Sequence, residues 1–108
     1  MPDTSLASAV SDPTPGEAFY LGEGYPLPFT DTIEIHFEVP VESLVKAEIY
    51  NIQGRVLAVL IDRRMPVGLH RLIWDGREDS GHRVAPGHYY CRVKIAGASQ
   101  FRKLVYVR

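Results

Sequence analysis

A chain of 108 residues, of which 45% are hydrophobic, is long enough to form one two-layer core but too short to add a separate catalytic lobe. Its net charge of -1 is unevenly divided, because residues 1–24 hold four acidic and no basic residues, whereas residues 25–108 hold twelve basic and nine acidic ones. So mild an excess of basic residues argues against nucleic-acid binding, which needs a concentrated basic surface.

The single cysteine and the hydropathy of the chain set further bounds. Cys91 is the only cysteine, so no disulfide can form within the chain. It alternates in phase with Tyr89, Val93 and Ile95, which indicates a small buried hydrophobe. No apolar run reaches the roughly 18 residues of a membrane-spanning helix, so we expect a chain that does not span a bilayer.

The first 30 residues lack the basic start and the apolar stretch of a secretory signal peptide. Two explanations stay open: the chain is the end of a larger exported protein, or it is complete and stays inside the cell. An initiator Met1 without a visible tag favours a complete gene product.

Residues 1–24 are rich in Pro, Gly, Ser and acid, a composition that buries too little apolar surface to fold alone. We therefore expect an extended acidic arm at residues 1–24, followed by one sandwich domain at residues 25–108. The arm contains Phe19, Tyr20 and Leu21. Either these side chains pack on the edge of the sandwich, or they bind a partner that orders the arm.

The next segments alternate as strands do. Residues 33–39 place apolar side chains on one face and Glu34, His36 and Glu38 on the other. Residues 45–52 repeat this pattern, and residues 51–54 have the composition of a turn. Residues 55–61 are apolar at both phases, which is typical of a strand covered on both faces, and we expect a loop at residues 63–68.

Trp74 ends the next predicted strand, residues 69–74, in phase with Leu72. A turn-rich excursion follows, and then two final strands at residues 88–96 and 100–107. About seven short strands without a helix predict an all-β fold, an antiparallel β-sandwich. Trp74 is then expected in the core, and an exposed indole that stacks on a sugar is the alternative.

Candidate metal ligands are few. Asp75, Glu78 and Asp79 lie in one Gly-containing loop, but their spacing does not fit an EF-hand, and aspartates beside glycine are typical turn formers. The four histidines lack the spacing of transition-metal sites: His36, His70, His82 and His88. We therefore expect no metal and no other cofactor.

Catalytic groups are equally sparse. Ser43, Ser80 and Ser99 stand outside a Gly-x-Ser-x-Gly elbow, and a Cys91 on an apolar strand face lacks the electropositive setting of a reactive thiol. Without an assembled acid, base and nucleophile, we expect neither an enzyme nor a small-molecule substrate.

Arg92 and Lys94 share the outward phase of one strand, and Arg102 and Lys103 lie on the next. This pattern usually marks a solvated sheet face. If Arg102 points to the same side as Arg92 and Lys94, the hairpin presents a basic surface for an acidic partner or for anionic headgroups.

Several motifs resemble one known family when they are taken together. They are Tyr25-Pro26-Leu27-Pro28-Phe29, Ile49 to Arg55, Gly68-x-His70, Trp74-Asp75-Gly76, and Gly87-x-Tyr89-x-x-Arg92. Across residues 25–108 the chain is similar to the FlgD immunoglobulin-like and type IX secretion sorting domains. The resemblance implies an immunoglobulin-like β-sandwich. Two departures are Leu27, where the family usually has Asn, and a shorter stretch after Phe29.

Two functions follow as hypotheses. The first is a non-catalytic structural subunit that stays in the cytoplasm or at the inner membrane and docks on a larger protein assembly. We expect its contacts at Phe19, Tyr20 and Leu21 of the arm and at a basic face formed by Arg92, Lys94 and Arg102. The second, implied by the resemblance, is a C-terminal sorting or attachment domain of a secreted or surface protein handled by a type IX secretion system.

Overall fold

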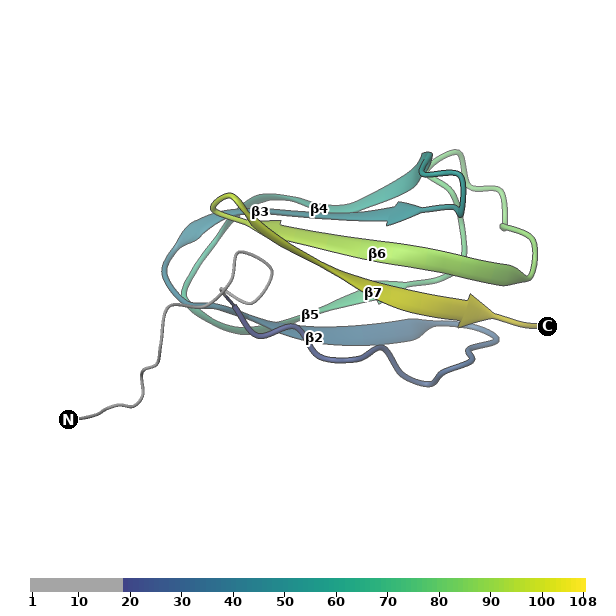
Figure 1. The fold of residues 1–108 in the computed structure, drawn as a ribbon, viewed down its shortest axis with the longest axis horizontal. Coiled ribbons are helices and arrows are strands. Elements are labelled where there is room, and N and C mark those ends of the chain that lie inside the picture. The colour runs from purple at the N-terminus through teal and green to yellow at the C-terminus, as the bar shows by residue number, and fades with distance from the viewer. Residues whose placement is uncertain (1–18) are drawn as a thin grey trace.

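The computed structural model describes residues 19–108, which form an all-β sandwich of six strands in two antiparallel sheets (Figure 1). This confirms the predicted fold class, and the expected strand number of about seven is close to the six found in this part of the chain. No helix in residues 19–108 has the length and hydropathy to cross a membrane. The strands are β2 (Ile33–Val39), β3 (Ser43–Tyr50), β4 (Val56–Met65), β5 (Gly68–Trp74), β6 (Gly87–Ile95) and β7 (Ala98–Tyr106).

The small sheet pairs β2 with β5 in a register that runs without interruption from Ile33 opposite Trp74 to Val39 opposite Gly68. Because strand side chains alternate between faces, β2 points its apolar set into the core. Four β2 side chains are fully buried there: Ile33, Ile35, Phe37 and Val39.

The large sheet has the order β4-β3-β6-β7 and faces the small sheet across the core (Figure 1). β6 sits in its middle and buries Tyr89, Cys91, Val93 and Ile95, as the alternation predicted. The pairing of β3 with β4 shifts twice, between Ala47 and Glu48 and between Ile49 and Tyr50. Such bulges add a residue to one strand and increase its twist.

The predictions for β4 were wrong in two respects. Its first half is not covered on both faces, since Val56 and Val59 are 41% and 38% exposed. The strand also continues to Met65 through the expected loop, since Arg63 and Arg64 pair with Val45 and Leu44 of β3.

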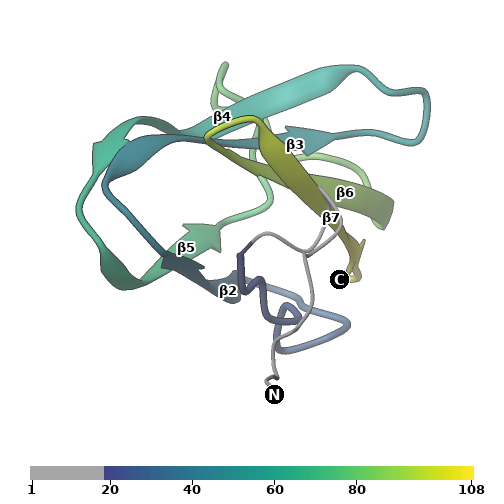
Figure 2. The same cartoon turned by 60° about the vertical axis from the view of Figure 1, so that its left-hand side comes forward.

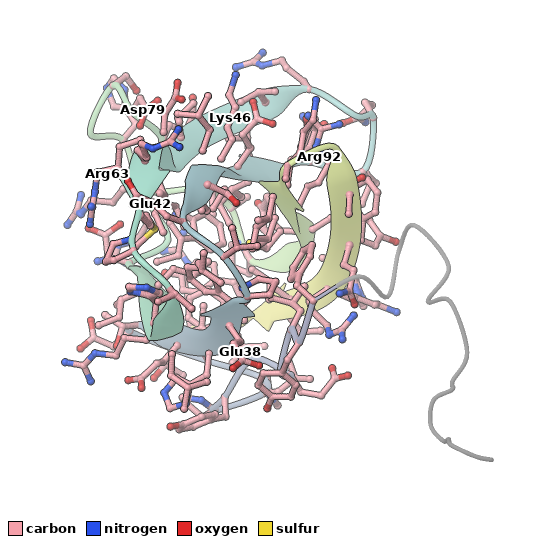
Figure 3. The ribbon with its side chains drawn as sticks, turned by 90° about the vertical axis from the view of Figure 1, so that its left-hand side faces the viewer. Glu38, Glu42, Lys46, Arg63, Asp79 and Arg92 are labelled. Atoms are coloured by element: carbon pink, nitrogen blue, oxygen red, sulfur yellow. The ribbon has the colours of Figure 1, made fainter. Side chains whose placement is uncertain are left out.

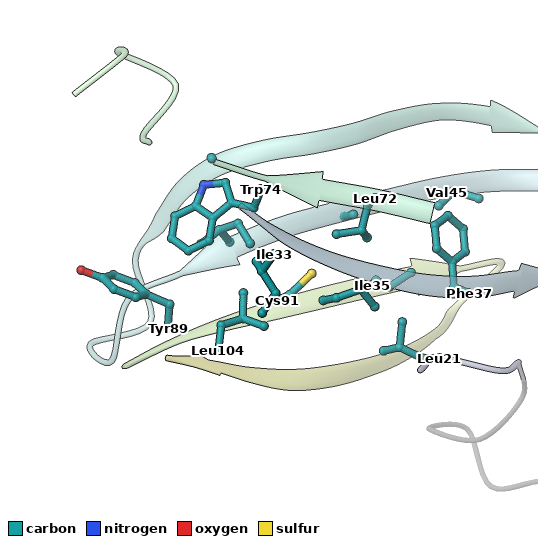
Figure 4. Packing of buried hydrophobic residues seen from close by; sticks show 14 of the residues in the cluster. Leu21, Ile33, Ile35, Phe37, Val45, Leu72, Trp74, Tyr89, Cys91 and Leu104 are labelled. Carbon is teal, nitrogen blue, oxygen red and sulfur yellow. The ribbon is translucent and has the colours of Figure 1, made fainter. Parts of the chain in front are cut away.

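Trp74 is the largest fully buried side chain of residues 19–108: it is 1% exposed and lies at one end of the sandwich (Figure 4). Its ring centroid is 5.7 Å from that of Phe29 and 5.5 Å from that of Tyr89, and Phe29 packs in turn on Tyr106. The indole Nε1 donates a hydrogen bond of 2.9 Å to the carbonyl of Arg77, so its polar atom is satisfied. Trp74 is therefore a core residue, which argues against the alternative of sugar stacking.

Residues 20–25 run along the free side of β2, and Phe29 then forms a bridge to Tyr106 of β7 (Figure 1). Backbone hydrogen bonds join Tyr20 to Glu38, Gly22 to His36, and Tyr25 to Glu34 in both directions. Residues 19–24 are the end of the predicted arm, and their packing on the sandwich agrees with the first of the two alternatives given for its aromatic segment. Residues 1–18 of the predicted arm lie outside the described residues, so the boundary of the arm stays a prediction.

Candidate interaction surface

The three side chains predicted in the arm alternate in direction. Phe19 and Leu21 are 7% and 4% exposed and belong to the core cluster, whereas Tyr20 is 56% exposed. The cause is the strand-like pairing of this segment with β2, which turns successive side chains to opposite faces. Of the three, Tyr20 is the one with a large surface to offer a partner, and partner binding by all three stays a prediction.

Arg102 does not share a face with Arg92 and Lys94. It pairs with Cys91 across β6 and β7, and directly opposed residues point to the same side of a sheet. Its guanidinium donates from Nη2 to the carbonyl of Leu21, and its Nε lies 3.4 Å from a carboxylate oxygen of Glu23. Arg102 therefore holds residues 21–23 against β7, and the condition for one basic face with all three residues is not met.

Arg92 and Lys94 lie on the opposite side of the large sheet, which we call the outer face. The register places them beside Glu48 and Lys46 of β3, and beside Phe101 and Ser99 of β7. Figure 3 shows Lys46 and Arg92 on this side of the molecule and Glu38 on the opposite side. The residues of the outer face that matter below are Lys46, Glu48, Tyr50, Tyr90, Arg92, Lys94, Phe101 and Lys103.

A fixed polar cluster lies at the centre of the outer face. Arg92 Nη2 is 2.8 Å from Glu48 Oε1, and the Tyr50 hydroxyl donates to the same oxygen at 3.0 Å. The Arg92 guanidinium also stacks on the Tyr50 ring, 5.4 Å from its centroid. These contacts fix Arg92, a long side chain, in one orientation at the surface.

The charge of this cluster is set by burial and by its hydrogen bonds. Burial alone would raise the pKa of Glu48, but the hydrogen bonds from Tyr50 and Arg92 and the charges of Lys46 and Arg92 outweigh it, so the pKa is lowered. Burial, followed by the bond to Glu48, raises the pKa of Tyr50. Glu48 is thus held as a carboxylate and Tyr50 as a neutral donor.

Exposed apolar side chains surround the cluster. Phe101, Tyr90 and Ile52 are 54%, 36% and 67% exposed, and they line a recess of about 270 Å³. Sequence reasoning selected the cations of this face and missed the aromatic residues. For Tyr90 the signal was present, because it occupies the outward phase of a strand whose inward residues, Tyr89 and Cys91 among them, were assigned to the core.

The loop carboxylates make backbone contacts. Asp75 accepts a hydrogen bond from the amide of Arg77 at 3.1 Å. Asp79 accepts one from Val59 at 3.1 Å, and its own amide donates to the carbonyl of Leu57 at 3.0 Å. Asp79 therefore pairs with the edge of β4 much as a strand residue would. Nowhere in residues 19–108 do three His, Cys, Asp or Glu side chains gather as a metal site requires.

Cys91 and the histidines are not assembled into a catalytic group in this part of the chain. Cys91 is fully buried, and burial raises the pKa of its thiol to about 12, so the reactive thiolate is disfavoured. His36 is paired with Glu34, His70 with the carbonyl of Pro66, and His82 with Ser80.

The small sheet has its own outer side, with different chemistry. Glu34 bonds to His36 and lies 3.6 Å from Arg71, and the His36 hydrogen bond, followed by the nearby charges, lowers the pKa of Glu34. Beside them is a recess of about 520 Å³, lined by Tyr20, His36, Leu69, His70 and Arg71.

Comparisons with known proteins place this arrangement in a family. The family model of the FlgD Ig-like domain matches residues 29–99. Among solved structures, FlgD from P. aeruginosa is 27% identical with a TM-score of 0.52, and the match covers 66% of this chain and 56% of that one. No curated protein sequence matches the chain.

Two further solved structures share the fold. PorZ, a surface component of the type-IX secretion system of Porphyromonas gingivalis, is 22% identical with a TM-score of 0.56, over 83% of this chain and 11% of that one. Dimeric latent PorU from the same organism is 19% identical with a TM-score of 0.59, over 78% and 9%. The chain thus spans only part of each of these proteins. From the family match over residues 29–99, the chain belongs to the FlgD Ig-like domain family.

Proposed function

We propose that this domain is a non-catalytic protein-interaction module that docks on a larger protein assembly through the outer face of the large sheet. The observation that carries the proposal is the fixed Arg92 guanidinium, set between exposed Tyr90 and Phe101. Tyr and Arg dominate the binding energy of protein interfaces, and Phe is enriched in them. An Arg that is already oriented loses little side-chain entropy on binding.

The charge of the outer face indicates the kind of partner. Arg92 and Lys46 share Glu48 as their carboxylate, and among the described residues no carboxylate pairs with Lys94 or Lys103. The face therefore keeps a positive excess around its aromatic residues. A partner with an acidic rim and an apolar centre suits it, because complementary charge speeds association and fixes orientation.

The test is co-purification of the native assembly from the host organism with three variants of the chain: Phe101→Ala, Tyr90→Ala and Arg92→Ala. We expect each to reduce recovery of the assembly, with Arg92→Ala also weakening its dependence on salt. Val41→Ala is the matched control, since Val41 is 63% exposed and lies in the turn between β2 and β3. Full recovery with all three variants would contradict docking through the outer face.

The N-terminal residues offer a second contact for the same function. Tyr20 is exposed, and residues 1–18 hold three acidic and no basic residues. Deleting residues 1–18, or replacing Tyr20 by Ala, is expected to weaken association with a basic partner surface. If recovery falls only with these changes, the arm rather than the outer face makes the contact.

A sorting or attachment role in type IX secretion is the second candidate. It is favoured by the likeness to PorZ, which is described as a surface component of that system, over 83% of this chain. In this case the domain would act at the cell surface rather than in the cytoplasm or at the inner membrane. Fusing it behind an exported reporter in a bacterium with a type IX system tests this role, and a reporter retained in the periplasm would contradict it.

A further inference from the structure

The sandwich has four edge strands, and three of them are covered or charged. Residues 20–25 bond to the outer edge of β2, and Phe29 bonds to Val105 and Val107 at the end of β7, whose earlier part carries Arg102 and Lys103. Asp79 pairs with the start of β4, and the rest of that edge carries Asp62, Arg63 and Arg64. Charged side chains and covering segments are the usual ways in which proteins protect a sheet edge.

The fourth edge, that of β5, is open. β5 pairs with β2 on one side, and within residues 19–108 no backbone hydrogen bond reaches its other side (Figure 2). The strand has seven residues, contains no proline or lysine, and keeps an unshifted register with β2. Its one charged side chain is Arg71, and within residues 19–108 it has neither a covering segment nor a proline to prevent another strand from pairing with it.

The side chains beside this edge favour an apolar and acidic occupant. On the outer side of β5, Leu69 is 73% and Ile73 is 48% exposed, and Arg71 lies between them with a side chain 64% exposed. Arg71 shares its carboxylate, Glu34, with His36. At the β4 edge, Arg63 has no carboxylate partner among the described residues. A strand placed beside β5 thus meets an apolar, a basic and an apolar position in turn.

A second copy of the chain fits this edge poorly in the register that pairs its apolar side chains. Antiparallel pairing of two β5 strands that sets Leu69 opposite Ile73 also sets Arg71 directly opposite Arg71. Like charges at directly opposed positions destabilise a strand pair. The same position opposite a carboxylate would form a favourable cross-strand pair.

We propose that the open edge of β5 binds an extended acidic segment of a partner protein, which adds to the small sheet as a further strand. Backbone hydrogen bonds to β5 supply affinity, as in other cases of strand addition. Two apolar side chains of the segment cover Leu69 and Ile73, and a carboxylate between them faces Arg71. This surface is separate from the outer face of the large sheet, so the proposal made for either surface can be refuted without the other.

The probe is the synthetic peptide Thr-Val-Thr-Glu-Thr-Val-Thr with blocked ends, whose symmetric pattern suits parallel and antiparallel pairing. Its matched controls carry Lys in place of Glu, or Pro in place of the two threonines beside Glu. Binding is followed by amide hydrogen exchange and by NMR titration of the full chain. We expect alternate amides of residues 68–74 to exchange more slowly, binding about fivefold to tenfold weaker with the Lys peptide, and none with the Pro peptide.

Protein variants sharpen the test. Arg71→Glu is expected to reverse the preference between the Glu and Lys peptides, and Leu69→Lys combined with Ile73→Lys to abolish binding. Val67→Lys is the control, because Val67 is 63% exposed and directly precedes β5. All these positions are exposed, so melting curves should show that the variants fold.

Three outcomes would overturn the proposal. The first is protection outside β5, or none, with the Glu peptide. The second is protection of β5 that rises with protein concentration without peptide, which indicates a second copy. The third is faster exchange in β5 after deletion of residues 1–18, which indicates that the chain covers its own edge.

Discussion

The two sheets bury similar inner faces and present different outer ones. β2 and β6 both point Ile, Val or aromatic side chains into one shared core. Outside, the small sheet carries Glu34, His36 and Glu38 on β2, whereas the large sheet carries Lys46, Arg92 and Lys94 around one buried carboxylate. The comparison teaches that the side chains that point inward determine the fold. The two sheets differ in what they can recognise because their outward-pointing side chains differ.

The largest loss of stability should come from a substitution in the core, which both sheets share. Trp74→Ala is expected to lower the free energy of unfolding by about 3–5 kcal/mol, because it empties a large aromatic site beside Phe29 and Tyr89. Urea denaturation measures this loss. A loss below about 1 kcal/mol would mean that the indole is not a core group.

The next largest loss of stability should distinguish the buried from the exposed side chains of residues 19–24. Leu21→Ala should cost about 2–4 kcal/mol, since the side chain is 4% exposed, whereas Tyr20→Ala should change stability by less than about 0.5 kcal/mol. Both variants are compared by denaturation. Equal and small losses would show that residues 19–24 are an arm and not part of the small sheet.

On the outer face of the large sheet, Arg92→Ala should cost about 1–3 kcal/mol, because Glu48 is 6% exposed and loses its closest cation. Lys94→Ala, on the same face, should stay within about 0.5 kcal/mol. The double variant Arg92→Ala with Glu48→Ala should recover part of the loss. A double variant no more stable than Arg92→Ala alone would indicate that packing, not the unpaired carboxylate, sets the cost.

The pH dependence of stability should differ between the two sheets, with an effect smaller than those above. The pKa of Glu48 is below its ordinary value of 4.5, so its stabilisation is present above that pH and is lost as the pH falls through the lowered value. The stability difference between the wild type and Glu48→Gln should therefore shrink below about pH 4.5. Glu34 shifts in the same direction, but its side chain is 24% exposed against 8% for Glu48, and Glu34→Gln should show the weaker dependence. Denaturation at pH 3 to 7 measures both, and the reverse order would refute this ranking of the faces.

The smallest expected effect is that of metal ions. Melting curves with calcium and with EDTA should superimpose, because Asp75 and Asp79 already accept backbone amides. A bound ion would raise the melting temperature by mass action, so a rise of several degrees with calcium would contradict the assignment of these residues to turns.

The sequence predicted those parts of the fold in which local alternation decides the outcome. β2 and β6 follow a strict period of two, so their buried residues were identified correctly. β4 did not follow this rule, because Leu57 and Leu60 fall where its register with β3 shifts, and Val56 and Val59 are left exposed. No local pattern encodes which strand will lie at an edge.

The candidate surface was predicted only in part for the same reason. Arg92 and Lys94 lie outward as their phase indicated, but the face of Arg102 depends on how the β6–β7 hairpin pairs. The burial of Phe19 and Leu21 depends on pairing with β2 across 16 residues of sequence, from Leu21 to Phe37. Contacts of this kind are tertiary: the apolar residues of the arm indicated that it could pack on the sandwich, but not which of them would be buried.

The buried thiol of Cys91 can report how often the native domain opens. Cys91 sits in the middle of the large sheet with no exposed area and a pKa raised to about 12, so a thiol reagent such as a disulfide dye reaches it only when the sandwich opens. As the only cysteine in the chain, it yields one unambiguous signal. Its labelling rate at increasing reagent concentration would therefore report how often the two sheets part in the native protein, without any engineered probe.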